Sequence, residues 1–242
     1  MIIGIIAVLA FAIVCIIGNS NRQNDSDNLV HPDSDAVCEV PYDSGYNEQE
    51  KRVESSKING REYVDLGLSV KWATCNLEGY YAWGETSVKS VYSWENYTYC
   101  NGTDEEITKY IIADSERGTE DNKGILDPKD DVAHVEWGGT WRMPTSEELN
   151  ELDDKCEWTW VENNGSLGYK VTGPNGNSIF LPAEGSQDDD DTRGFKPYNI
   201  YWSSSVRAGR VEKANCIMFD ETFHGTGSGR RSSGACIRPV SN

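Results

Sequence analysis

Basic residues are scarce in this chain of 242 residues: 22 Lys and Arg stand against 40 Asp and Glu, which gives a formal net charge of −18. A protein that binds nucleic acid needs a basic surface to displace the counterions of the phosphates, so the charge balance argues against this class. Docking on anionic lipid through a polybasic face is disfavoured for the same reason. We therefore expect no nucleic-acid partner.

Histidine is also rare, with His31, His134 and His224 as its three occurrences. Their spacing matches no zinc motif. The chain contains no G-x-S-x-G nucleophile motif, and its glycine-rich run at 225–229 lacks the Gly-Lys-Ser/Thr ending of a phosphate-binding loop. We interpret that run as a flexible surface loop and predict that the chain is not an enzyme.

Residues 1–18 form a wholly uncharged, mostly apolar run. As a helix they would span about 27 Å, just enough for a bilayer core. A cleaved signal peptide, a lipoprotein acylated at Cys15 and an uncleaved anchor are all open. We favour the anchor because neither a basic leading region nor a small-residue cleavage site is clear. Each alternative places the rest of the chain in the cell envelope or on the cell surface.

Residues 19–57 are polar and acidic, with nine acids, four bases and no helical or strand periodicity. This composition is typical of a flexible stalk. Ordered sequence begins near Ile58. We therefore divide the chain into a hydrophobic anchor or signal segment (1–18), an acidic stalk (19–57) and one folded domain (58–242).

The domain reads as α+β, with two short helices, small twisted antiparallel sheets and long loops. Thr145 and Glu148 form a capping box that opens one helix, with Leu149, Leu152 and Cys156 on its buried side. Asp130 or Asp131 opens the other helix. Strand-like runs occur at 63–72 (bending at Gly67), 80–84, 168–171, 178–181, 201–205, 215–219 and 235–240.

Five segments carry a family resemblance: YVDLGLSVKWATCN (63–76), YAWGET (81–86), DVAHVEWGGTWRMPT (131–145), YWSSS (201–205) and IRPV (237–240). In this order they resemble the "major paralogous domain" proteins of Bacteroides-, Prevotella- and Fibrobacter-type bacteria. The resemblance covers about residues 58–242. It implies a C-type-lectin-like fold related to the formylglycine-generating enzymes, which modify sulfatases.

Neither known activity of these related groups carries over. The enzymatic branch binds copper through a cysteine pair near its C-terminus, and Cys216 and Cys236 lack the local pattern of that pair. The sugar-binding branch uses Glu-Pro-Asn or Gln-Pro-Asp with Trp-Asn-Asp to hold calcium, and none of these tripeptides occurs here.

Two structural features are expected from residue types. In an exported chain Cys216 and Cys236, on two late strands, are the best candidates for a disulfide. Asp127, Asp130 and Asp131 are candidate ligands for a structural calcium ion, although Asp131 is equally well placed as a helix N-cap. No other cofactor is expected.

We expect a membrane-anchored, surface-displayed module that binds an unknown protein or glycan through its C-terminal loops. Six basic residues and three acids follow residue 206, so this region is less acidic than the chain as a whole. Retroelement-driven diversification and ordinary drift both explain its unusual residues. The alternatives are an adhesin with one fixed partner and a formylglycine-generating-type enzyme. The expected ligand-contacting residues are Tyr201, Arg207, Arg210, Met218, His224, Arg230 and Arg231, with Trp202 in the core.

Overall fold

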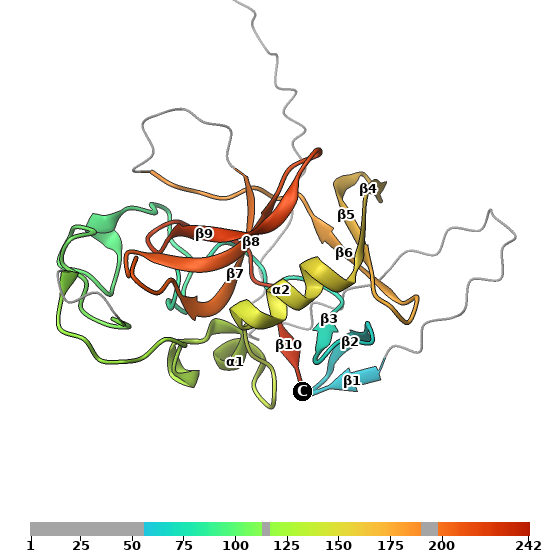
Figure 1. The fold of residues 1–242 in the computed structure, drawn as a ribbon, viewed down its shortest axis with the longest axis horizontal. Helices are drawn as coiled ribbons and strands as arrows, with labels where there is room; N and C mark the ends of the chain where they lie inside the picture. Colours follow the sequence, from blue (N-terminus) through green and yellow to red (C-terminus); the bar gives the residue numbers. More distant parts are fainter. Residues whose placement is uncertain (1–55, 113–116, 190–197) are drawn as a thin grey trace, which may run out of the picture. The chain divides into compact units, whose positions relative to one another are not determined.

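The computed structural model describes residues 56–112, 117–189 and 198–242, and these form an α+β fold of short helices and three small antiparallel sheets (Figure 1). The expected α+β class is therefore confirmed. The anchor segment 1–18 and nearly all of the stalk lie outside the described residues. Within the described ranges, no helix has the length and apolarity needed to cross a membrane.

The first sheet joins the beginning of the domain to its C-terminus. It contains β1 (Ser56–Ile58), β2 (Arg61–Asp65), β3 (Lys71–Ala73) and β10 (Val240–Ser241), in the order β1-β2-β3-β10. The predicted strand pair around Gly67 is confirmed, and Gly67 has a φ of 75°, which favours glycine. Strand β1 begins at Ser56, two residues before the expected start of the folded domain at residue 58.

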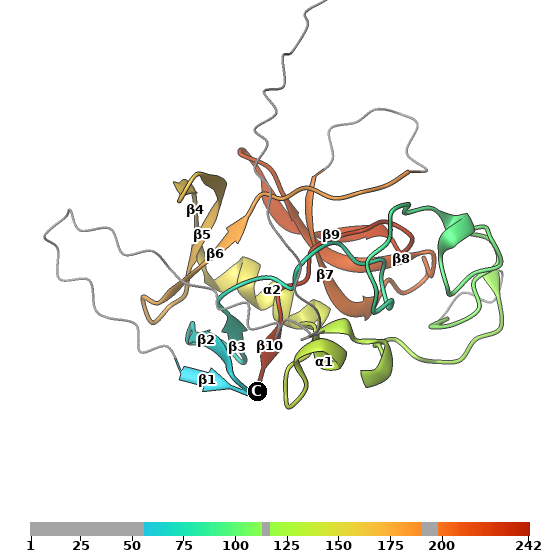
Figure 2. The ribbon, with the colours of Figure 1, turned by 180° about the vertical axis from the view of Figure 1, so that it is seen from behind.

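The second sheet is the meander β4 (Glu157–Asn163), β5 (Ser166–Thr172) and β6 (Ser178–Pro182). The third contains β7 (Asn199–Val206), β8 (Lys213–Phe219) and β9 (His224–Arg230), with β8 in the middle. Figure 2 shows the sheets from behind, with α2 between the second and third. The run at 225–229 is thus the interior of β9 and not a loop, which corrects the sequence-based interpretation.

Strand β9 escaped prediction because its residues alternate between glycine and polar side chains. Gly227 and Gly229 lie where neighbouring side chains cross the strand. A Cβ at Gly229 would lie 2.6 Å from the Trp202 ring, and one at Gly227 would lie 2.9 Å from Met218. The glycines therefore make room for large side chains of β7 and β8, so the strand has no apolar period of its own.

Both predicted helices are present. Helix α1 (Val132–Trp137) follows the 3-10 turn η3 (Pro128–Asp130), and Asp131 caps it by accepting a hydrogen bond from the His134 backbone. Helix α2 (Ser146–Lys155) has the full capping box of Thr145 and Glu148. Leu149 and Leu152 face the core, as predicted, whereas Cys156 is the half-buried residue that follows the helix as its C-cap.

The core consists of three apolar clusters. One surrounds Trp83, Trp141 and Trp202, the second surrounds Trp72 and Tyr201, and the third holds the loop around the 3-10 turn η1 (Trp94–Asn96). The predicted strands at 80–84 and 235–240 are mostly irregular. They meet in isolated bridges, such as Tyr81 with Ala235, and only Val240–Ser241 is a regular strand.

Candidate functional site

The turn between β7 and β8 presents cations on a braced backbone. The Arg207 amide donates to the Lys213 carbonyl, the Arg210 amide to the Arg207 carbonyl, and the Lys213 amide to the Arg210 carbonyl, at 2.7–3.1 Å. Gly209 has a φ of 69° inside the four-residue turn that the bond between Arg210 and Arg207 closes. These bonds fix the backbone that carries the three cationic side chains. We call residues 207–213 the basic turn.

Arg210 is held from one side by a buried carboxylate. Its Nε donates to Oε1 of Glu212 at 2.7 Å, while its side chain is 58% exposed and that of Glu212 only 5%. The second oxygen of Glu212, Oε2, lies 3.8 Å from Nε of Arg117. Glu212 therefore lies beneath the turn, and the guanidinium of Arg210 extends above it.

Arg207 and Lys213 flank Arg210. Arg207 is exposed and Lys213 half-buried. Within the described part of the chain neither side chain forms a hydrogen bond or an ion pair. No described carboxylate pairs with either charge, so the basic turn has cationic groups at its surface that are available to a ligand.

Arg230 lies at the same end of the third sheet, because its Cα pairs with that of Lys213. Its Nη1 lies 3.3 Å from Oδ2 of Asp188, which also accepts a hydrogen bond from the Ser233 hydroxyl at 3.0 Å. Arg230 is thus a half-buried partner of Asp188, beside the basic turn. Its free capacity for a ligand is smaller than that of Arg210.

Arg231 lies in the core, which corrects its assignment to the ligand face. It is fully buried, with its guanidinium 4.6 Å from the centre of the Trp83 ring. It donates to the hydroxyl of Tyr97 and to the carbonyls of Val211 and Lys109, at 2.8–2.9 Å. Its role in the described structure is to tie three loops together.

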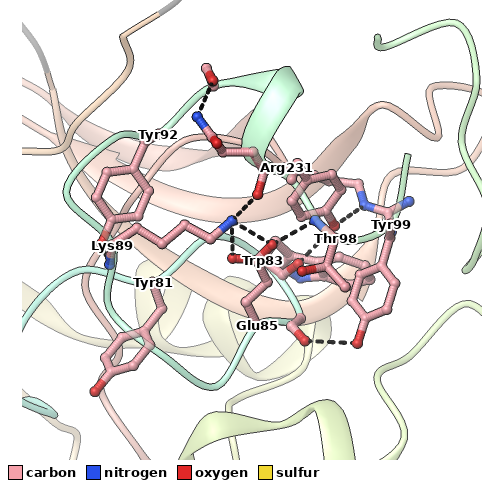
Figure 3. Close-up of polar contacts among 12 residues, drawn as sticks. Tyr81, Trp83, Glu85, Lys89, Tyr92, Thr98, Tyr99 and Arg231 are labelled. Atoms are coloured by element: carbon pink, nitrogen blue, oxygen red, sulfur yellow. Dashed lines mark hydrogen bonds and ion pairs between the residues drawn. The ribbon is translucent and has the colours of Figure 1, made fainter. Parts of the chain in front are cut away.

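Figure 3 shows the neighbourhood of Arg231. Oε1 of the buried Glu85 accepts hydrogen bonds from Nζ of Lys89 and from the Thr98 backbone, both at 2.7 Å. The Tyr97 hydroxyl donates to the Trp83 carbonyl at 2.7 Å, and burial raises the pKa of this phenol, which stays neutral. This polar cluster holds the loop that covers Arg231.

Tyr201 is also a core residue and not a ligand-contacting one. Its side chain is 2% exposed, and its hydroxyl donates to the Pro182 carbonyl and accepts from Nδ2 of Asn76. The side chain of Arg238 lies in the same region and donates to Oδ1 of Asn76 at 2.8 Å. Trp202 is fully buried, as expected.

Met218 and His224 lie toward the opposite end of the third sheet from the basic turn. His224 pairs with Phe219 and Arg230 with Lys213, so the ends of β9 are roughly 20 Å apart. His224 stacks on Trp158 at 4.6 Å, and its Nδ1 lies 2.8 Å from Asp153 of α2. The seven expected ligand residues therefore do not form one site. Arg207, Arg210 and Arg230 come together, without the other four.

The three aspartates of the calcium hypothesis already have protein partners. Asp127 pairs with Lys123 at 2.7 Å, Asp130 accepts from Lys109 and Tyr110, and Asp131 accepts from the Met143 and His134 backbones. Burial would raise the pKa of Asp130, but the bonds from Lys109 and Tyr110 lower it. Within the described ranges, no group of three or more His, Cys, Asp or Glu side chains is arranged to hold a metal ion.

Cys216 and Cys236 are free thiols, so the predicted disulfide is wrong. Cys216 is paired with Trp202 on β7, whereas Cys236 forms a bridge with Tyr201, the preceding residue. Successive side chains of a strand point to opposite faces. The two thiols accordingly belong to different core clusters and cannot share a bond or a metal ion.

Two residues of the basic turn were missed by sequence reasoning. Glu212 lies between Arg210 and Lys213 in the sequence, and an acid between two bases ordinarily indicates a solvated surface. Only the burial of Glu212 distinguishes it, and burial depends on the packing of Arg117 and Arg231 around the turn.

Comparison with known proteins gives no match: no family model fits the chain, and neither a curated protein nor a solved structure is detectably similar to it.

Proposed function

We propose that this chain is a ligand-binding module displayed at the cell surface, and that its ligand contacts the basic turn. The observation that carries the proposal is the contrast between the turn and the acidic domain around it. Arg207 and Lys213 are unpaired within the described residues, and Arg210 is exposed on a braced backbone. Exposed, positioned cations of this kind supply specific contacts to a charged partner.

The interior supports a scaffold role for the rest of the domain. Three buried side chains form hydrogen bonds with backbone and side-chain groups inside the fold: Arg231, Tyr201 and Arg238. Their bonds tie long loops to the sheets. We propose that this frame keeps the basic turn in place.

The finer family assignment belongs to the same proposal. The ordered motifs at 63–76, 81–86, 131–145, 201–205 and 237–240 support a C-type-lectin-like fold of the "major paralogous domain" type. The two short helices and small antiparallel sheets are compatible with it. We further propose that residues 1–18 anchor the chain in the membrane, because they carry no charge over a length that spans a bilayer core.

Location and binding are tested separately on the full-length chain. Protease added to intact cells of the producing organism should remove the domain, whereas a cytoplasmic domain would survive until the cells are lysed. The detergent-purified chain is then screened against glycans and envelope proteins. Binding that is lost in Arg207→Gln/Arg210→Gln supports the module. A screen without any binder contradicts it, and one tight protein partner that is indifferent to these substitutions favours the adhesin alternative.

A further inference from the structure

We infer that the basic turn takes an anionic glycan, a polysaccharide bearing carboxylate or sulfate groups, and that Glu212 positions Arg210 to bind one of these groups. The inference rests on the proposed function and specifies its ligand.

The orientation of Arg210 is the first argument. A guanidinium can present two parallel N–H bonds to an oxyanion. Glu212 occupies Nε of Arg210, and within the described residues Nη1 and Nη2 donate no hydrogen bond. The outer edge formed by these two nitrogens therefore remains open for a bidentate hydrogen-bonded contact with a carboxylate or sulfate.

The charges around Arg210 are the second argument. Among the described acids near the turn, Glu212 is paired with Arg210, Asp188 with Arg230, and Asp104 lies 3.7 Å from Arg117. Arg207 and Lys213 have no such partner among the residues that the structure describes. An anion above the turn would meet three cationic side chains, while the nearest described acids are already paired with arginines.

The surroundings of the turn favour a glycan over other polyanions. A protein interface requires buried aromatic or aliphatic anchors at its centre. Among the described residues, the exposed apolar side chain of Ile125 is placed near the turn by its backbone bridge to Ser205, and the turn itself presents charged side chains. A lipid surface or a nucleic acid would carry a dense array of phosphates against a chain of net charge −18. A hydrated polysaccharide with well-spaced charges fits a few cations on a projecting turn.

Glu212 acts as a positioning residue in this account. Its side chain is only 5% exposed, so it lies below the plane where the ligand binds. By fixing Nε it reduces the number of orientations that the long side chain of Arg210 must lose on binding. Substitution of Glu212 should thus weaken the contribution of Arg210 without removing a ligand contact.

The test measures binding of the full-length chain, purified in detergent, to chondroitin sulfate and to polygalacturonate, with neutral dextran as the blank. Arg210→Gln should weaken binding to the preferred polyanion about tenfold. Lys170→Gln removes the charge of an exposed lysine on β5 that has no partner among the described residues, and it should leave the affinity unchanged. Comparison of the two polymers distinguishes sulfate from carboxylate recognition.

The role of Glu212 is tested by a double-mutant cycle. In the Glu212→Gln background, adding Arg210→Gln should weaken polyanion binding by less than about threefold, because Glu212 no longer fixes the Arg210 side chain. If the effects of the two substitutions on the binding free energy are fully additive, and the melting temperature is unchanged, the positioning role of Glu212 is overturned. If Glu212→Gln unfolds the chain, Arg207→Gln tests the turn instead, since its exposed side chain has no described partner.

The outcomes separate this inference from the proposed function. Binding of a protein or neutral glycan without binding of either polyanion overturns the glycan inference and leaves the module intact. Equal loss of affinity in Lys170→Gln and Arg210→Gln overturns the site, because only net charge would then matter. Absence of binding to every probe contradicts both.

Discussion

At the residue scale, Arg230 and Arg231 show why neighbouring identical side chains have different roles. Arg230 ends β9 at the rim and pairs with Asp188, whereas Arg231 turns inward beneath Tyr97 and Trp83. The partners of Arg231 lie more than a hundred residues away in sequence, apart from Val211. No local pattern could have predicted its burial, which is decided by tertiary packing.

We predict that Arg231→Met lowers the free energy of unfolding by about 3 kcal/mol or more, because three buried acceptors lose their donor. Arg207→Met serves as the control and should change stability by less than about 0.5 kcal/mol, since that side chain is exposed. Chemical denaturation of both variants provides the measurement. If Arg231→Met is as stable as Arg207→Met, the hydrogen bonds of Arg231 do not stabilise the fold.

The thiols yield a second prediction at this scale. Burial raises the pKa of Cys216 to about 12 and that of Cys156 to about 11, so few thiolates exist at neutral pH. Iodoacetamide should label both slowly in the native chain and quickly in denaturant. Peptide mapping without reductant should find Cys216 and Cys236 labelled separately. A linked peptide pair would contradict the described core.

At the element scale, what could be predicted depended on how local each signal was. Helix α2 was predicted because Thr145 and Glu148 satisfy each other's backbone within one turn. Strands β4 and β9 were missed, since their side chains are selected by partners elsewhere, as Gly229 is by Trp202. The basic turn was only half predicted for the same reason: Arg207 and Arg210 are visible as cations, but the burial of Glu212 is not.

The capping box of α2 yields a prediction on pH. Burial would raise the pKa of Glu148, but hydrogen bonds from Arg142 and Thr145 outweigh it and lower the pKa. Because folding lowers the pKa of Glu148, its carboxylate stabilises the fold when the pH is above the ordinary glutamate pKa of about 4.3. This stabilisation is lost as the pH falls below that value. Glu148→Gln should lower the free energy of unfolding by about 1–2 kcal/mol at pH 7 and by less at pH 3.

Melting curves of the wild type and Glu148→Gln across this pH range test the prediction. The exposed Glu147→Gln, in the same first turn of α2, serves as the control for loss of charge. A difference between wild type and Glu148→Gln that stays constant from pH 7 to pH 3 would rule out the ion pair with Arg142 as its source.

At the scale of the whole molecule, net charge and local charge give different information. The total of −18 argues against partners that need a broad basic surface, and residues 19–57 contribute −5 of this total. Local pairing then decides where cations remain available. Lys109, Lys123 and Arg142 are bound to carboxylates, whereas Arg207 and Lys213 have no carboxylate partner within the described ranges.

The most direct test of the central claim is the affinity of the full-length chain for the polyanion at several salt concentrations. We predict binding that weakens steadily as salt rises, and a clearly shallower salt dependence in the triple variant Arg207→Gln/Arg210→Gln/Lys213→Gln. If the triple variant binds as tightly as the wild type, with the same salt dependence, then the basic turn is not the ligand-binding site.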